Sequence, residues 1–208
     1  MTHTLNRRGL TEERPGEEMV VLCMVHRKDK ASKMEAMKKM VRTIFKYNPD
    51  NIIGAPLGFG EDDIVGMAAA AGVATAVFND KGRVTRLIED IKSQGLGISV
   101  VLSGLFKDSQ EICGRCGLEG HTFNISLGTF GKTEKLPDAK TLEITTQCGH
   151  GLISPHLVKN TVKRIKKGNI TCEEGARLLI KPCVCGISNP QRISKILDTM
   201  ALEDSSDR

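Results

Sequence analysis

Hydrophobic residues along the first two thirds of the chain alternate between short continuous runs and helix-like spacings. Residues 19–25 form a continuous apolar run typical of a buried strand, and residues 73–78 form a second one. Between these runs, apolar residues recur at helical spacing from Met34 to Phe45, with lysines on the opposite face. The same reasoning predicts further strands at 98–102 and 123–127, and further helices at 62–71, 84–91 and 109–113.

Strands that alternate with helices favour an α/β fold with a mostly parallel sheet flanked by helices. Beyond Pro137 the pattern changes to short helices with cysteine-containing loops between them. We therefore expect an α/β sheet domain over 19–137 and a small C-terminal helical subdomain, cysteine-bearing and metal-binding, over 138–200. Residues 1–18 are polar, charged and non-periodic, which predicts a mobile N-terminal tail, and 201–208 is expected to be a polar tail.

Two segments near the C-terminus repeat one another. Residues 148–155 align without a gap on residues 183–190, with the shared pattern Cys-x-(His/Cys)-Gly-(Leu/Ile)-x-(Ser/Asn)-Pro. The Ser/Asn is suited to an N-cap and the proline to a first helical turn, so each loop is expected to lead into a helix. A capping box at Thr171 and Glu174 predicts a third helix between them. The sulfur atoms then precede helix N-termini, where free N–H groups and the helix dipole favour negative charge.

The repeated loops supply four candidate metal ligands, Cys148, His150, Cys183 and Cys185. The three cysteines are the preferred cofactor ligands, because a histidine beside glycines also commonly hydrogen-bonds a loop carbonyl. Three thiolates and an imidazole suit either an iron–sulfur cluster or a zinc ion. Soft ligands and a cysteine spacing tighter than that of zinc fingers favour a cluster, of the 4Fe–4S type with one iron open to substrate, over zinc. The simpler alternative is that the cysteines are small buried apolar residues.

A second cysteine group, Cys113 and Cys116 with His121 nearby, forms a possible second site. It suits a redox dithiol, half of a zinc knuckle or additional cluster ligands. The predicted helix precedes this motif instead of following it, so the thioredoxin mechanism of thiol activation fits poorly. Cys23 lies in a predicted strand and is expected in the core, whereas Cys172 lies at a helix start, where its thiol would be more acidic.

Two other features have both a functional and a structural explanation. A glycine-rich turn at 54–60 precedes the acidic run 61–63, at the sheet edge where α/β proteins often bind ligands. The acids argue against phosphate and are also ordinary helix-capping residues. A basic helix over 159–167 is either a solvated face or a docking surface for an acidic protein, such as an electron carrier.

Composition limits the remaining possibilities. Aromatic residues make up 3% of the chain, so the core must be aliphatic, and few rings are available to stack nucleic-acid bases, which argues against nucleic acid as a partner. No apolar run reaches the roughly 20 residues needed to span a bilayer. Arg7 and Arg8 are not followed by the apolar stretch of an export signal. Seven cysteines without a secretory signal indicate a reducing compartment, the cytoplasm.

These patterns predict a cytoplasmic iron–sulfur protein with redox, oxidoreductase-like, or Lewis-acid chemistry on a small molecule or with an electron-transfer protein. The first alternative is a zinc-stabilised binding module without catalysis. The second is a thiol redox or sulfur-transfer protein that uses Cys113 and Cys116. The sequence assigns no catalytic residue, no substrate and no oligomeric state.

Overall fold

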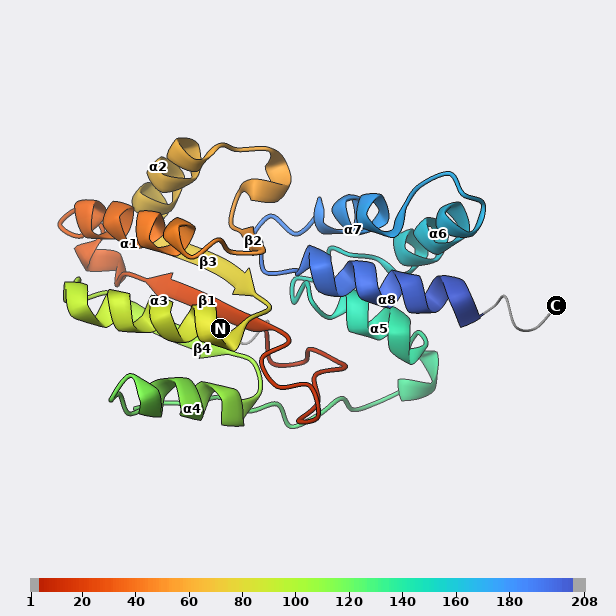
Figure 1. Ribbon diagram of the computed structural model, residues 1–208, viewed down its shortest axis with the longest axis horizontal. Helices are drawn as coiled ribbons and strands as arrows, with labels where there is room; N and C mark the ends of the chain where they lie inside the picture. Colours follow the sequence, from red (N-terminus) through yellow and green to blue (C-terminus); the bar gives the residue numbers. More distant parts are fainter. Residues whose placement is uncertain (1–3, 204–208) are drawn as a thin grey trace.

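The computed structural model describes residues 4–203 of the chain, which contain eight α-helices and four short strands (Figure 1). The strands are β1 (Met19–Met24), β2 (Asn51–Ile52), β3 (Val73–Phe78) and β4 (Ser99–Ser103). The helices of the first half are α1 (Met34–Lys46), α2 (Glu61–Ala71), α3 (Lys81–Gln94) and α4 (Phe106–Arg115). Those of the second half are α5 (Ala139–Thr145), α6 (Pro155–Lys166), α7 (Cys172–Ile180) and α8 (Pro190–Glu203).

The sheet is antiparallel throughout, with strand order β2-β3-β1-β4. Strand β1 pairs with β3 on one side and with β4 on the other, and β2 pairs with β3, each time antiparallel. The fold is α/β as expected, but the prediction of a mostly parallel sheet is wrong.

The error lies in which strands are neighbours. Strands β1 and β2, joined by α1, run in the same direction because both are antiparallel to β3, but β3 lies between them. Strands β3 and β4, joined by α3, are separated by β1 in the same way. Each strand–helix–strand unit is thus split by a strand of the other unit, which makes every hydrogen-bonded pair antiparallel.

The two faces of the sheet belong to different hydrophobic cores. Because alternate residues of a strand face opposite sides, Met19, Val21 and Cys23 of β1 pack with buried residues of α1–α4. Val20 and its cross-strand partner Val77 face the other way and pack with α6–α8 and the cysteine loops. The sheet therefore connects the two halves of the molecule.

The helix starts predicted near the cysteine loops are confirmed. Ser154 caps α6 by accepting from the backbone N–H of Leu157, and Thr171 and Glu174 form a capping box at α7. The side chain of Asn189 accepts from the N–H of Arg192 at 3.1 Å at the start of α8. These caps fix where each loop ends and its helix begins.

The strand predicted at 123–127 is absent. Its alternating apolar residues are strongly exposed in an irregular connection between α4 and α5. The alternating pattern is typical of a strand, but within the described residues this segment pairs with no other strand.

Residues 4–18, expected to be a mobile tail, contact both halves of the molecule. The N–H of Gly16 donates to Asp108 of α4 at 2.7 Å, and the N–H of Arg8 donates to Thr146 beside α5 at 3.0 Å. Helix α8 extends three residues into the expected C-terminal tail; the rest of that tail and residues 1–3 lie outside the described residues. No described helix has the length and apolar character needed to cross a membrane.

Candidate metal centre

The two repeated loops lie side by side and bring their four candidate ligands together. The sulfur atoms of Cys183 and Cys185 are 3.8 Å apart, and the Cys185 sulfur is 3.7 Å from Nδ1 of His150. The thiol of Cys148 makes a hydrogen bond with Cys183 from the other side. The four side chains thus contact one another in the order Cys148, Cys183, Cys185, His150.

The centre is closed on one side and open on the other. Cys148 and Cys183 are fully buried in the second hydrophobic core, among aliphatic side chains of α5–α8. Cys185 is half-buried and His150 is exposed, so solvent reaches the centre from their side. A shallow groove with an uncharged lining, which includes Thr145, Thr146 and Gly149, also borders Cys148.

The three thiols share negative charge unequally. Hydrogen bonds from Cys148 and then Cys185 lower the pKa of the Cys183 thiol, in opposition to burial. The same interaction with Cys183, added to burial, raises the pKa of both Cys148 and Cys185. Hydrogen bonds from the neighbouring thiols therefore favour negative charge at Cys183, and a bound cation would favour ionisation of all three.

The loops also direct backbone N–H groups at all three sulfur atoms; these oppose the rise in the pKa of Cys148 and Cys185 and add to the lowering of the pKa of Cys183. The donors are Leu152 and His150 for Cys148, Ser188 for Cys183, and Ile187 for Cys185. N–H groups directed at sulfur favour thiolates in the same way that oxyanion sites favour anions.

The second cysteine loop is held against the edge of the sheet. The N–H of Gly54 donates to the carbonyl of Val184 at 3.1 Å, and the side-chain amide of Asn51 donates to the carbonyl of Ser188 at 2.9 Å. The hydroxyl of Thr75 in β3 donates to the carbonyl of Cys185. These hydrogen bonds to β2, β3 and the turn after β2 hold in place the backbone of the loop that carries Cys183 and Cys185.

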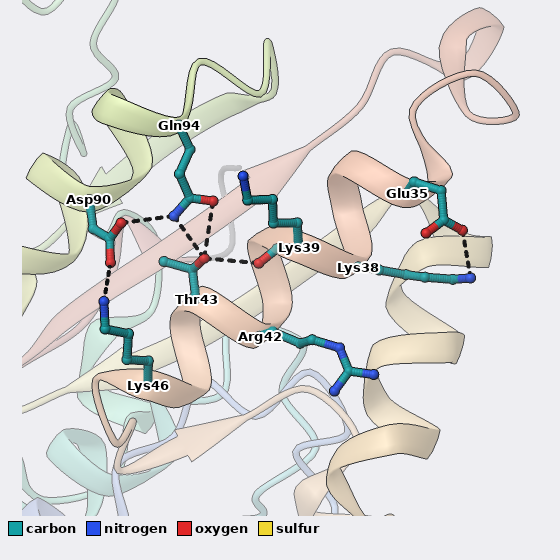
Figure 2. Close-up of a pocket in the computed structure, with 8 residues that line it drawn as sticks. All are labelled: Glu35, Lys38, Lys39, Arg42, Thr43, Lys46, Asp90 and Gln94. Atoms are coloured by element: carbon teal, nitrogen blue, oxygen red, sulfur yellow. Dashed lines mark hydrogen bonds and ion pairs between the residues drawn. The ribbon is translucent and has the colours of Figure 1, made fainter.

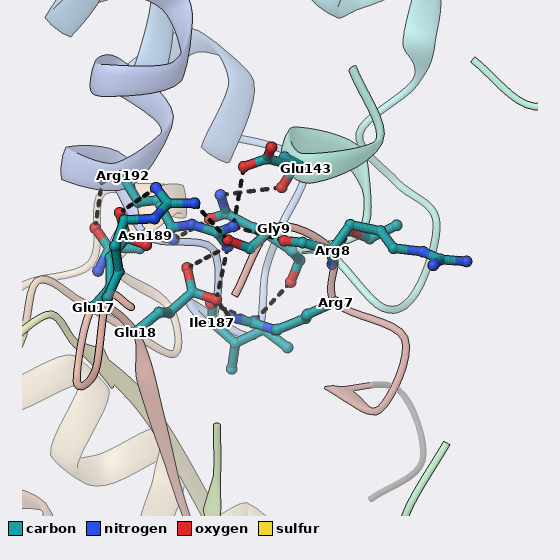
Figure 3. Close-up of polar contacts among 12 residues, drawn as sticks. Arg7, Arg8, Gly9, Glu17, Glu18, Glu143, Ile187, Asn189 and Arg192 are labelled. Atoms are coloured by element: carbon teal, nitrogen blue, oxygen red, sulfur yellow. Dashed lines mark hydrogen bonds and ion pairs between the residues drawn. The ribbon is translucent and has the colours of Figure 1, made fainter. Parts of the chain in front are cut away.

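Arg7 joins the two loops. Its guanidinium donates to the carbonyl of Gln147 at 2.7 Å in the first loop and to the carbonyl of Ile187 at 2.6 Å in the second. The same guanidinium pairs with the buried carboxylate of Glu18, which Arg192 of α8 also approaches at 3.4 Å (Figure 3). The buried Glu18 carboxylate thus lies between two arginines, and one of them, Arg7, holds both loops.

These supporting residues were missed from the sequence. The sequence motifs draw attention to Arg7 only through the Arg7–Arg8 pair of an export signal, and to Arg192 not at all. The one available signal was that Arg192 follows the repeated Asn/Ser-Pro pair, close to a cysteine loop. Buried arginine partners are determined by tertiary contacts, and residue spacing does not reveal them.

The four donor side chains contact one another, but they do not yet surround a position for an ion. Across residues 4–203, no group of three or more His, Cys, Asp or Glu side chains already surrounds a position for a metal ion. The donors instead contact one another in sequence, so binding one ion requires their side chains to rotate toward a common point.

Comparison with known proteins finds no matching family model, no similar curated protein and no similar solved structure.

The possible second site lies with the first hydrophobic core, the one that packs against α1–α4. Cys116 is buried with α3 and α4, its thiol donates to the carbonyl of Thr85 at 3.6 Å, and burial raises its pKa. Cys113 is half-buried, while His121 is exposed and contacts the neighbouring Thr122. A buried thiol with a raised pKa is a poor nucleophile, which argues against thiol redox chemistry here.

The other cysteines behave as packing residues. Burial raises the pKa of Cys23 to about 12, consistent with its place in the core. Cys172 does lie at the start of α7, but partial burial and then the nearby Asp198 and Glu173 raise its pKa instead of lowering it. Burial first, and the two nearby acids second, therefore oppose the more acidic thiol expected at this helix start.

A surface depression lies away from the cysteines, between α1 and α3 (Figure 2). Two of the lysines that line it are paired: Lys46 of α1 with Asp90 of α3 at 2.8 Å, and Lys38 with Glu35 within α1 at 2.7 Å. The hydrogen bond from Lys46, followed by that from Gln94, lowers the pKa of Asp90 to about 2. The contact between Lys46 and Asp90 joins α1 to α3 and indicates a structural role.

Proposed function

We propose that the protein binds one metal ion through Cys148, Cys183, Cys185 and His150. The observation that supports this most is the spacing of the donors. A tetrahedral zinc ion with Zn–S bonds of about 2.3 Å holds two sulfur atoms about 3.8 Å apart. Cys183 and Cys185 are 3.8 Å apart, and Cys185 and His150 are 3.7 Å apart, so these two neighbouring pairs already have about the separation that a shared ion requires.

The bound ion would have a structural role in the first instance. It would join the loop before α6 to the loop before α8, both of which lead into the second hydrophobic core. Ionising three contacting thiols without a cation is costly, so binding should release protons and weaken at low pH. All seven cysteines are free, which supports a reducing compartment such as the cytoplasm.

An iron–sulfur cluster is the second candidate, and the N–H groups directed at the three sulfur atoms support it. A four-iron cluster binds its cysteines through separate iron atoms, so the sulfur atoms would have to move apart. A two-iron cluster fits the present spacing better, with Cys183 and Cys185 on one iron. The solvent-facing His150 side and the groove beside Cys148 would then give a small molecule access for redox or Lewis-acid chemistry.

Anaerobic purification of the full chain, followed by zinc, iron and acid-labile sulfide analysis and a visible spectrum, tests the proposal. One zinc per chain without colour supports the first candidate, and iron with sulfide and a brown colour supports the second. Cys183→Ser should lose the metal, whereas Cys172→Ser, outside the cluster, should retain it. A chain that binds neither metal, or a Cys183→Ser variant that retains it fully, would overturn the proposal.

A further inference from the structure

The connection between α4 and α5 exposes an unusual amount of apolar surface. Phe123, Ile125, Leu127 and Phe130 are 68%, 64%, 81% and 80% exposed, respectively. The segment runs along the edge of the molecule without pairing to the sheet (Figure 1). Contiguous exposed side chains of this size are typical of an interaction surface.

The segment presents its apolar side outward because its polar side is attached to the protein. The hydroxyl of Ser126 donates to the side chain of Asn6 at 2.6 Å and accepts from the N–H of Gly128 at 3.1 Å. Arg8 donates to the hydroxyl of Thr129 at 2.6 Å. Both anchors come from the N-terminal segment, so the outward orientation is held by specific contacts.

The backbone of the segment is also not paired with other backbone groups in the part of the chain that the structure describes. Within the described residues, none of its amides or carbonyls from 119 to 130 forms a hydrogen bond to another backbone group. Its alternating sequence nevertheless has a strong strand preference. Both the side chains and the backbone therefore favour contact with another molecule.

We propose that this segment is the contact between two copies of the chain, packed about a two-fold axis at Ile125. The apolar pattern is nearly symmetric about this residue, so a two-fold rotation places Phe123 against Leu127 and Ile125 against itself. Residues 122–131 carry no charge, so two copies approach without like-charge repulsion despite the net charge of +5. An acidic or basic partner would find no complementary charge within this stretch.

The exposed area is sufficient for a dimer. At about 150–250 Å² for a fully exposed aromatic side chain, the four residues present on the order of 500 Å² per copy. Two copies therefore bury on the order of 1,000 Å², the lower limit of specific interfaces. Phe106, 51% exposed and with its ring 5.5 Å from that of Phe123, extends the surface further. We expect a reversible dimer with micromolar affinity.

Opposite charges at Ile125 give the sharpest test. Ile125→Asp and Ile125→Lys should each weaken self-association at least about tenfold, because like charges meet at the axis. An equimolar mixture of the two variants should form the dimer again, because opposite charges then meet. Leu202→Asp, a control with the same 64% exposure on α8, should leave association unchanged.

Sedimentation equilibrium of the full chain over a micromolar concentration series provides the measurement, with circular dichroism to verify the fold of each variant. A wild-type chain that stays monomeric overturns the proposal. So does a mixture that stays monomeric while each variant is folded, since Ile125 would then not face its own copy. Metal content does not enter this test, so the result is independent of the proposed metal centre.

Discussion

At the scale of single residues, Gly186 sets how closely the second cysteine loop approaches the sheet. Its φ is +62°, and an added Cβ would lie 2.0 Å from the carbonyl carbon of Ile52 and 2.1 Å from its oxygen. These are backbone atoms of β2, which cannot move away as a flexible side chain can. The sequence aligns Gly186 with Gly151, which has a similar φ of +70° but no atom within 4 Å of an added Cβ.

The two glycines therefore make a matched pair of substitutions. Gly186→Ala should lower the free energy of unfolding by at least about 2 kcal/mol, from overpacking added to left-handed backbone strain. Gly151→Ala should cost about 1 kcal/mol, from the backbone strain alone. Urea unfolding of both variants measures the difference. Equal losses would mean that the contact with Ile52 does not constrain the loop.

At the scale of elements, the N-terminal segment supports the two cysteine loops. Arg7 contacts the backbone of both, and its charge is balanced by Glu18 just before β1. The Arg7 and Glu18 side chains are only 4% and 1% exposed, so removal of one partner leaves the other charge buried. The loops are accordingly held in place by a segment far from them in the sequence.

Replacing Arg7 should loosen both loops at once. Arg7→Ala should destabilise the protein by about 3–5 kcal/mol and speed amide hydrogen exchange in 147–153 and 182–189 together. Arg14→Ala is a suitable control, because Arg14 belongs to the same segment but has a half-exposed side chain that donates to Gly9 and Glu17 and not to either cysteine loop within the described residues. Faster exchange in one loop alone would contradict a shared anchor.

The sequence predicted individual elements better than their arrangement. The bounds 73–78 of β3 and the caps at Ser154 and Thr171 follow from local patterns, and the structure has each of them. The repeat of the cysteine motif also led us to expect that the two loops meet, and Cys185 does contact His150. The insertion of β3 between β1 and β2 depends on tertiary packing, which strand–helix alternation does not encode. The unpaired segment 123–127 shows the same limit, since a strand pattern does not specify a partner.

At the scale of the whole molecule, the sheet contributes to two cores that lie on its opposite faces. Val77 of β3 packs with the cysteine-bearing core, while its neighbours Ala76 and Phe78 pack with α1–α4. Because one strand belongs to both cores, opening either core disrupts the other. This arrangement favours a single cooperative unit over two domains that fold separately on either side of Pro137.

Val77→Ala tests that cooperativity, because the Val77 side chain is fully buried and packs in the cysteine-bearing core and not in the core of α1–α4. Loss of two buried methyl groups should cost about 2 kcal/mol. In a cooperative molecule, native-state hydrogen exchange should show this same loss in α1 and α3 as in α6 and α8. The half-buried Val101 of β4 gives a control, since Val101→Ala should cost less in both halves. A loss confined to α6 and α8 would instead identify the C-terminal half as a separate folding unit.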